Sequence, residues 1–170
     1  ASNVKWVSYE MRAAGEDVKI DNLDVFTTVS TGYATAGLDN GKVFLNGVQV
    51  GSTKDLVSTS GTTGDTNFTF GSSFILKAGT KAIVDIYADA KTSTSAAFNT
   101  GDTVQIGLDT GSTNGTGQVS LSSINTPTSD VTANSITLSS SSVTLSKNTG
   151  YGNQNMIAGT NSARLGSFVL

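Results

Sequence analysis

Apolar and polar residues alternate along most of this chain, and that spacing restricts it to β-structure. Within 81–89, every second residue is apolar and falls on one face of an extended segment, and the residues between fall on the other. The same period of two recurs at 104–108, 136–138 and 143–145. Helical periodicity is nearly absent, and 155–158 is the single short helical candidate. An all-β fold follows.

Asn46-Gly47 joins two short apolar runs, 42–45 and 48–50, and suits the positive φ values of a type I′ hairpin. About ten to twelve short strands at this spacing predict a two-sheet antiparallel sandwich with Ig-like Greek-key connections, and a jelly roll is the alternative. The sandwich is expected to span 1–160, with a separate C-terminal strand at 161–170. The alternation assigns the following residues to the core: Val18, Ile20, Phe44, Phe70, Leu76, Val84, Ile86, Val104, Ile106 and Leu138.

The amino-acid composition argues against several classes of function. The chain has no His and no Cys, so the commonest general base and any thiolate nucleophile are missing, and we do not expect an enzyme. Its net charge is −3 and its ten Lys and Arg residues are scattered, which argues against nucleic-acid binding. No apolar run reaches the length of a membrane span. With 48 Ser and Thr and only 14% charged residues, the chain is expected at the cell surface, outside the cell.

The two ends of the chain resemble each other. Residues 161–170 read NSARLGSFVL and residues 2–11 read SNVKWVSYEM, an offset of 159 positions. Residue class agrees at five aligned pairs: Arg164 with Lys5, Leu165 with Trp6, Ser167 with Ser8, Phe168 with Tyr9, and Leu170 with Met11. The first residue is Ala1, with no initiator Met, so we expect a mature form or a piece of a longer polypeptide.

A second internal similarity concerns the hairpin that follows the first strand. Residues 9–21 (YEMRAAGEDVKID) and 74–85 (FILKAGTKAIVD) share an aromatic, aliphatic, basic, Ala and Gly order, whereas residues 168–170 stop before the turn. The strand 163–170 is also apolar on both faces, and as an exposed edge strand it would be prone to aggregation. We therefore expect it to be donated to the next subunit or repeat, and an ordinary final strand is the alternative. The predicted assembly interface is Leu165, Phe168, Val169 and Leu170, with Trp6.

Several segments resemble the Ig-like β-sandwich repeats of bacterial or archaeal surface proteins. They are AAGEDVKIDNLDV (13–25), VFLNGVQVGST (43–53), FILKAGTKAIVDIYAD (74–89), GDTVQIGLDT (101–110) and AGTNSARLGSFVL (158–170). The resemblance implies an extracellular structural role, as an S-layer unit, an adhesin stalk or a donor-strand filament. It implies copies of the chain as partners, joined head-to-tail. It brings no catalytic residues.

Oxygen ligands cluster in two places and indicate calcium. Extracellular sandwiches often use calcium to stiffen loops. The candidate ligands are Glu16, Asp17, Asp21 and Asp24 in one group and Asp102 and Asp109 in the other. Two sequons, Asn67-Phe-Thr69 and Asn114-Gly-Thr116, permit glycosylation where the host performs it.

A carbohydrate-binding or adhesive module is the alternative function. Asp85 and Asp89 flank Tyr87 on one face of a strand, which suits a sugar platform, although a solvated outer face explains the same pattern. The other aromatic residues are dispersed along the chain. An exposed coplanar row of aromatic rings would distinguish this function from a structural one.

Overall fold

The computed structural model describes residues 2–29, 38–56, 63–90, 98–139, 146–147, 150 and 167–169. The chain divides into two units, Ala1–Ser139 and Ser140–Leu170, here called the sandwich unit and the tail unit. Within the described ranges, no helix is long and apolar enough to cross a membrane. The boundary expected at 160/161 and the helical candidate at 155–158 both lie outside the described residues.

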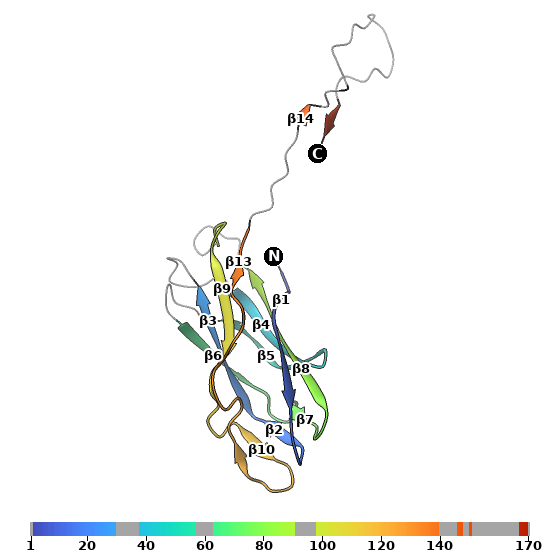
Figure 1. The fold of residues 1–170 in the computed structure, drawn as a ribbon, viewed down its shortest axis with the longest axis vertical. Helices are drawn as coiled ribbons and strands as arrows, with labels where there is room; N and C mark the ends of the chain where they lie inside the picture. The colour runs from blue at the N-terminus through green and yellow to red at the C-terminus, as the bar shows by residue number, and fades with distance from the viewer. Residues whose placement is uncertain are drawn as a thin grey trace, which may run out of the picture. The chain divides into compact units, whose positions relative to one another are not determined.

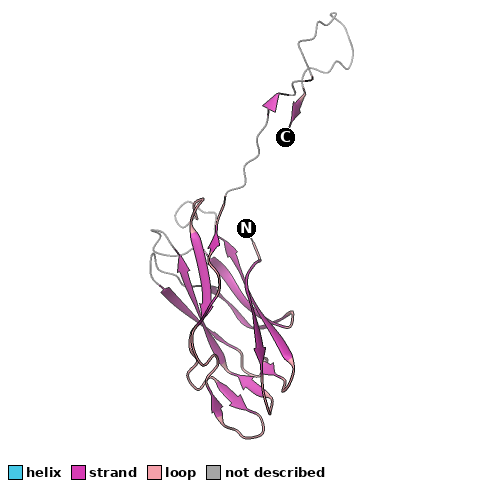
Figure 2. Cartoon of the chain, viewed as in Figure 1, coloured by secondary structure: helices cyan, strands magenta, loops and turns pink. Residues whose placement is uncertain are grey.

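Thirteen named strands of the sandwich unit form three antiparallel sheets (Figures 1 and 2). The first sheet has the order β1 (Val4–Arg12), β8 (Lys81–Ala90), β4 (Leu38–Leu45) and β5 (Val48–Leu56). The second has the order β12 (Val131–Thr132), β9 (Thr103–Leu108), β3 (Asn22–Val29) and β6 (Thr63–Thr69), and β13 (Ile136–Thr137) also pairs with β9. The third has the order β11 (Ser123–Ile124), β10 (Gly115–Gly117), β2 (Val18–Ile20) and β7 (Ile75–Leu76).

The second and third sheets form one continuous layer. β2 passes into β3 with only Asp21 between them. At this junction the backbone N–H of Asp21 donates to Asn114 O (2.8 Å) and Asp21 O accepts from the N–H of Phe70 (2.9 Å). The pairing therefore carries across the break between the two sheets. The layer packs against the first sheet, and the predicted two-sheet antiparallel sandwich is confirmed.

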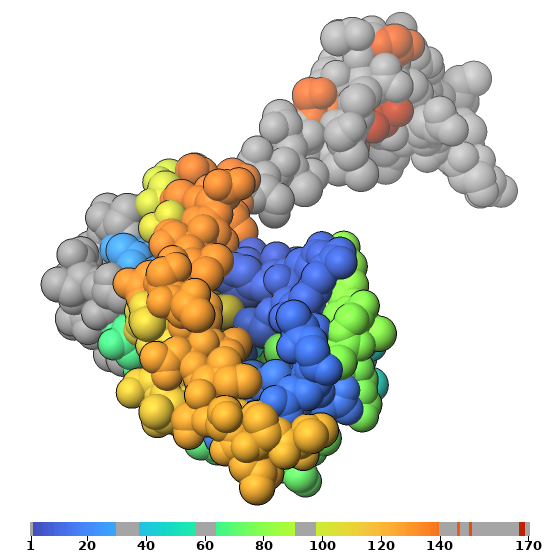
Figure 3. Space-filling view, turned by 60° about the horizontal axis from the view of Figure 1, so that its bottom comes forward, coloured from blue at the N-terminus to red at the C-terminus, as the bar shows by residue number. Residues whose placement is uncertain are grey.

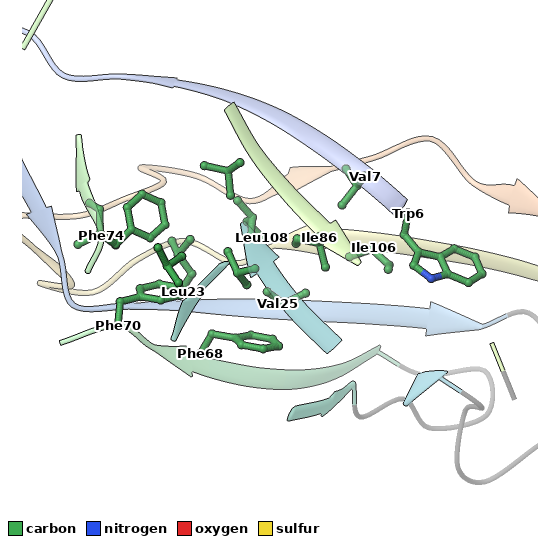
Figure 4. Packing of buried hydrophobic residues seen from close by; sticks show 14 of the residues in the cluster. Trp6, Val7, Leu23, Val25, Phe68, Phe70, Phe74, Ile86, Ile106 and Leu108 are labelled. Carbon is green, nitrogen blue, oxygen red and sulfur yellow. The ribbon is translucent and has the colours of Figure 1, made fainter. Parts of the chain in front are cut away.

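The core lies between these two layers, and Figure 4 shows part of it. The strands bury one face each because their apolar residues recur every second position. Eight of the ten core predictions are confirmed as buried: Val18, Ile20, Phe70, Leu76, Val84, Ile86, Val104 and Ile106. Leu138 is only partly buried against the core.

Phe44 is the core prediction that was wrong. On β4 the buried residue is Val43, which pairs with Ile86 on one side and Val50 on the other. Phe44 therefore points to the outer face, where its ring meets Tyr87 edge-on with centroids 4.9 Å apart. A shift of one residue exchanges the two faces of a strand.

The Asn46-Gly47 hairpin prediction is confirmed. Both residues have positive φ, 49° and 83°, and they join β4 to β5. Asn46 also extends the sheet beyond the turn, because its backbone N–H donates to Ile83 O and its Oδ1 accepts from the Ile83 N–H, both at 2.8 Å.

The two layers approach each other closely on the side of β5 and β6. Lys54 Nζ donates to Asn67 O (2.7 Å) across this side. Gly51 has a φ of 72°, and a Cβ there would lie 2.6 Å from Thr69 O. This side of the sandwich is therefore closed by backbone contact. The opposite side lies between β1 and the β12–β13 region.

Candidate functional site

Strand β1 is an edge strand of the first sheet. It pairs with β8 from Val4↔Ala88 to Arg12↔Lys81, and no described strand pairs with its other edge. A free strand edge presents unpaired N–H and C=O groups, which another strand can accept or donate to. The open edge of β1 is therefore a ready template for a further strand.

A β-bulge between Lys5 and Val7 alters the start of β1. It allows Trp6 and Val7, which are neighbours in sequence, both to be buried, since a bulge re-aims side chains. The indole Nε1 of Trp6 donates to Ala88 O (3.2 Å), and only 7% of the residue is exposed. Trp6, predicted at the assembly interface, thus belongs to the core of the sandwich unit and borders its open side.

Two adjoining hollows follow the open edge of β1, and together they are called the β1 groove. Figure 3 shows the surface hollowed between the blue N-terminal residues and the orange segment near residue 130. One hollow, of about 470 Å³, is lined by Tyr9, Glu10, Met11, Arg12, Ala13, Ala14, Val18, Leu76, Leu108, Ile124, Asn125, Thr126, Pro127, Thr128 and Val131. The other, of about 490 Å³, is lined by Trp6, Val7, Ser8, Tyr9, Val131, Thr132, Ala133, Asn134 and Ile136.

Tyr9 lies where the two hollows meet, since it lines both. Its hydroxyl donates to Ile106 O (3.2 Å) on β9 and so links the two layers across the groove. Burial raises the pKa of Tyr9 to about 12, because the phenolate is poorly solvated there. The side chain therefore stays neutral and acts as a structural donor at ordinary pH.

The far wall of the groove is short and partly apolar. β12 and β13 are two residues each, and Val131 and Ile136 are both 38% exposed. Ile124 is partly buried against the core. Apolar side chains along an unpaired edge are typical of a surface that another chain covers.

The tail unit contains one described pair of strands. β14 (Ser146–Lys147) pairs antiparallel with β15 (Phe168–Val169), with Ser146 opposite Val169 and Lys147 opposite Phe168. Phe168 is 65% exposed. The other predicted interface residues of this segment, Leu165 and Leu170, lie outside the described residues.

The first group of predicted calcium ligands is engaged within the protein. Glu16 accepts from the backbone N–H groups of Val119 (2.5 Å) and Ser120 (2.9 Å), and hydrogen bonds from Ser120 and then Val119 lower its pKa. Asp17 accepts from Lys77 Nζ (2.7 Å), and this bond is the main cause of its lowered pKa. Both carboxylates hold neighbouring turns in place.

The other two members of this group make separate contacts. Asp21 pairs with Lys19 (2.8 Å), and Asp24 accepts from Asn67 Nδ2 (2.7 Å). The structure thus gives each of the four residues its own, different set of partners.

In the second predicted group, Asp102 is buried and accepts from the backbone N–H of Asn99 (2.7 Å). Asp109 lies apart from it, and its pKa is raised by burial first and then by the carboxylates of Asp65, Asp130 and Asp24. Within the described ranges, no three or more acidic, His or Cys side chains are arranged to hold a metal. Calcium stays a prediction, which melting in millimolar calcium and in chelator tests.

The residues considered for a sugar platform mostly contact other parts of the sheet. Asp85 is buried beside Lys5 Nζ (3.5 Å), and Asp89 accepts hydrogen bonds from two asparagines. The rings of Tyr87 and Phe44 meet at 61°. These two rings are edge-on, so they do not form a coplanar pair.

The two sequons differ in accessibility. Asn114 is 2% exposed, and its Nδ2 donates to Asn22 O (2.9 Å) and Thr126 O (2.6 Å). A glycan on this nitrogen would break both contacts in the folded protein. Asn67 is exposed, although its amide donates to Asp24.

Sequence reasoning missed the β1 groove. Its near wall, β1, was recognised as a strand, but which edge of β1 remains unpaired depends on sheet order. The far wall, 124–136, shows no regular alternation that predicts a strand of useful length. No protein-family model, curated protein or solved structure matches this chain.

Proposed function

We propose that this chain is an extracellular structural repeat or subunit that joins head-to-tail to copies of itself by β-strand donation. The open edge of β1 is the acceptor, and the observation that carries the proposal is the β1 groove beside it. The groove is lined by both apolar and polar side chains, follows an unpaired strand, and lies opposite the closed β5–β6 side. A further strand there would complete both the sheet and the core.

The tail unit is the donor. Its residues 163–170 match 4–11 in residue class, and they add to the open edge of β1 in the next copy and so extend that sheet. Phe168 corresponds to Tyr9, and its exposure in the tail unit agrees with a side chain whose core belongs to another copy. The resemblance to surface-protein repeats and the Ser/Thr-rich composition support a position outside the cell.

The physical basis of the joint is β-augmentation. Main-chain hydrogen bonds hold the added strand, and alternate side chains enter pockets of the acceptor. A donor at one end and an acceptor along β1 make a heterologous contact, which propagates as a rod or filament unless its rotation closes a ring. The proposed assembly is therefore a filament, a stalk or a surface layer, and the chain acts in it as a structural component and not as an enzyme.

The test is the self-association of the full chain, measured by sedimentation velocity up to about 1 mM, which detects association free energies as weak as about −4 kcal/mol. We expect the average mass to rise in multiples of 17.4 kDa. Val131→Asp places a charge in the groove and should weaken association at least tenfold.

The matched control is Val119→Asp, because Val119 is exposed and lies outside the residues that line the groove. This variant should associate like the wild type. A chain that stays at 17.4 kDa at every concentration would contradict the proposed function. Equal weakening by both variants would contradict the placement of the acceptor at the β1 groove.

A further inference from the structure

We propose that Phe168 of one copy is the anchor of the joint and enters the 490 Å³ hollow of the β1 groove of another copy, here called the Trp6 hollow. The 470 Å³ hollow beside it is called the Arg12 hollow. The assignment rests on the proposed function, because it takes the tail of one copy as donor and the β1 groove of another as acceptor.

Phe168 differs from the other large aromatic residues in its exposure. It is 65% exposed on β15, whereas every other Phe or Trp in the described ranges is buried or partly buried. Aromatic side chains that enter pockets contribute much of the binding energy of protein interfaces. Phe168 is therefore the described residue of the tail unit that suits the role of an anchor.

The linings of the two hollows differ in charge. No charged side chain lines the Trp6 hollow, whereas Glu10 and Arg12 both line the Arg12 hollow. These two side chains form an ion pair with each other (2.8 Å) in an exposed position. Covering charged groups with a phenyl ring removes them from water without offering a hydrogen bond in return. The uncharged hollow is therefore the better pocket for Phe168.

Polar groups that border the Trp6 hollow already have hydrogen-bond partners within the protein. Trp6 Nε1 donates to a backbone carbonyl of β8 (3.2 Å), and the Tyr9 hydroxyl donates to one of β9 (3.2 Å). The N–H of Ala133 also donates to a β9 carbonyl (3.1 Å), and its carbonyl accepts from Gln105 Nε2 (2.9 Å). An apolar ring can therefore enter without leaving these groups unsatisfied.

The far wall of the Trp6 hollow supplies apolar contacts. Val131 and Ile136, each 38% exposed, both line this hollow, and of the two only Val131 also lines the Arg12 hollow. An apolar cavity of about 150 Å³ holds a benzene ring, so 490 Å³ has room for a phenyl side chain. The joint thus removes Val131, Ile136 and Phe168 from water together.

Charged substitutions distinguish the two hollows. Ile136 lines only the Trp6 hollow and Thr128 only the Arg12 hollow, and both residues are exposed. We expect Ile136→Asp to weaken association in sedimentation velocity at least tenfold and Thr128→Asp to change it less than twofold. Thermal melts show that each variant is folded. The reverse pattern overturns the inference and leaves the proposed function standing, because the β1 groove is then still the acceptor.

Truncation of the anchor tests the donor side. Phe168→Ala should weaken association at least tenfold, and Phe168→Leu, which keeps an apolar group, should weaken it less. The melting temperature of the sandwich unit should stay unchanged in both variants, because Phe168 belongs to the tail unit. Unchanged association of Phe168→Ala overturns the inference.

Chemical cross-linking tests the contact with mild substitutions, since the chain contains no Cys. Ser167→Cys keeps the anchor and is mixed with Asn134→Cys, Thr128→Cys or Thr53→Cys in the presence of a short bismaleimide. Asn134 is exposed and lines only the Trp6 hollow, and Thr53 is exposed on the opposite edge strand, β5. A size tag on one partner identifies the mixed dimer. We expect its yield with Asn134→Cys to exceed the other two yields at least fivefold.

The other outcomes of the cross-linking experiment contradict the assignment in different ways. Equal yields at all three positions indicate random collision and overturn the inference. A highest yield with Thr128→Cys places the anchor at the Arg12 hollow, and a highest yield with Thr53→Cys places it at β5, so either result overturns it. Absence of association in the wild type contradicts the proposed function itself, and with it the assignment of the anchor.

Discussion

Glu16 shows how one exposed carboxylate organises a turn far away in sequence. It accepts from the backbone N–H groups of Val119 and Ser120, more than one hundred residues later in the chain. A hydrogen bond from the Ser120 side chain first, and then these backbone bonds, lower its pKa. Its pKa in the folded state is therefore below the unfolded value. Such a group adds stability above the unfolded pKa, and this stability is lost as the pH falls through the folded pKa.

Glu16→Gln should accordingly lower the melting temperature at pH 7 and have a smaller effect at pH 2, because the stabilisation by the carboxylate is lost as the pH falls through its folded pKa. Thermal melts of both proteins across that range measure the difference. An equal loss at both pH values would show that shape rather than charge matters at this position.

The pKa of Asp109 is shifted in the opposite direction from that of Glu16. Burial first and then the carboxylates of Asp65, Asp130 and Asp24 raise its pKa. A carboxyl whose folded pKa lies above its unfolded value favours the folded state at low pH, and this advantage is lost as the pH rises through the folded pKa. Asp109→Asn removes the charge and should raise the melting temperature at pH 7 but not at pH 3, in the presence of chelator.

Asp130→Asn is the matched control for Asp109→Asn. Asp130 is a neighbouring carboxylate whose pKa is lowered by its hydrogen bonds from Thr110, at 2.6 and 2.8 Å. Its replacement should lower the melting temperature at pH 7. If both variants shift the melting temperature in the same direction, the assignment of opposite pKa shifts is wrong.

At the scale of single elements, β8 is the strand that its sequence predicts best. It lies between β1 and β4, and the alternation in Lys81–Ala90 correctly indicated that Ala82, Val84, Ile86 and Ala88 face the core. A central strand has its two faces in constant environments along its length, so a period of two is enough to assign them.

Two isoleucines of β8 test that assignment. Ile86 is fully buried, whereas Ile83 is on the other face and only partly buried. Ile86→Ala should cost about 2–5 kcal/mol of unfolding free energy through lost contacts and a cavity. Ile83→Ala should cost clearly less. Urea denaturation of the two variants gives both values, and equal losses would contradict the assignment.

β1 and β4 show where alternation is insufficient. On β4 the run KVFL offers either Phe44 or Val43 to the core, and the cross-strand pairing of Val43 with Ile86 selects Val43. On β1 the bulge after Lys5 buries Trp6 and Val7 together, which breaks the period of two. Both outcomes depend on partner strands that are distant in sequence, so local pattern alone does not predict them.

At the scale of the whole molecule, the sandwich type was predictable and the β1 groove was not. Strand number and turn spacing indicate two layers, but the order of strands within a layer decides which edges stay open. Here β1 is the edge strand of one sheet, and the two-residue strands β12 and β13 lie at the edge of the other. The hollow between them is a property of tertiary arrangement and has no local sequence signature.

Hydrogen exchange along β1 tests the open edge directly. In a strand, successive residues direct their N–H groups to opposite edges, so alternate amides of residues 8–12 point to β8 and the others point away from it. In a dilute sample we expect the first set to be protected and the second to exchange at least tenfold faster. The central strand β8, paired on both edges, should be protected at both sets of amides and is the internal control. Concentrating the protein should slow the fast set of β1 selectively, because a donated strand accepts those N–H groups. Residue-resolved NMR exchange at two concentrations measures this, and uniform protection of β1 in the dilute monomer would show that its second edge is already occupied.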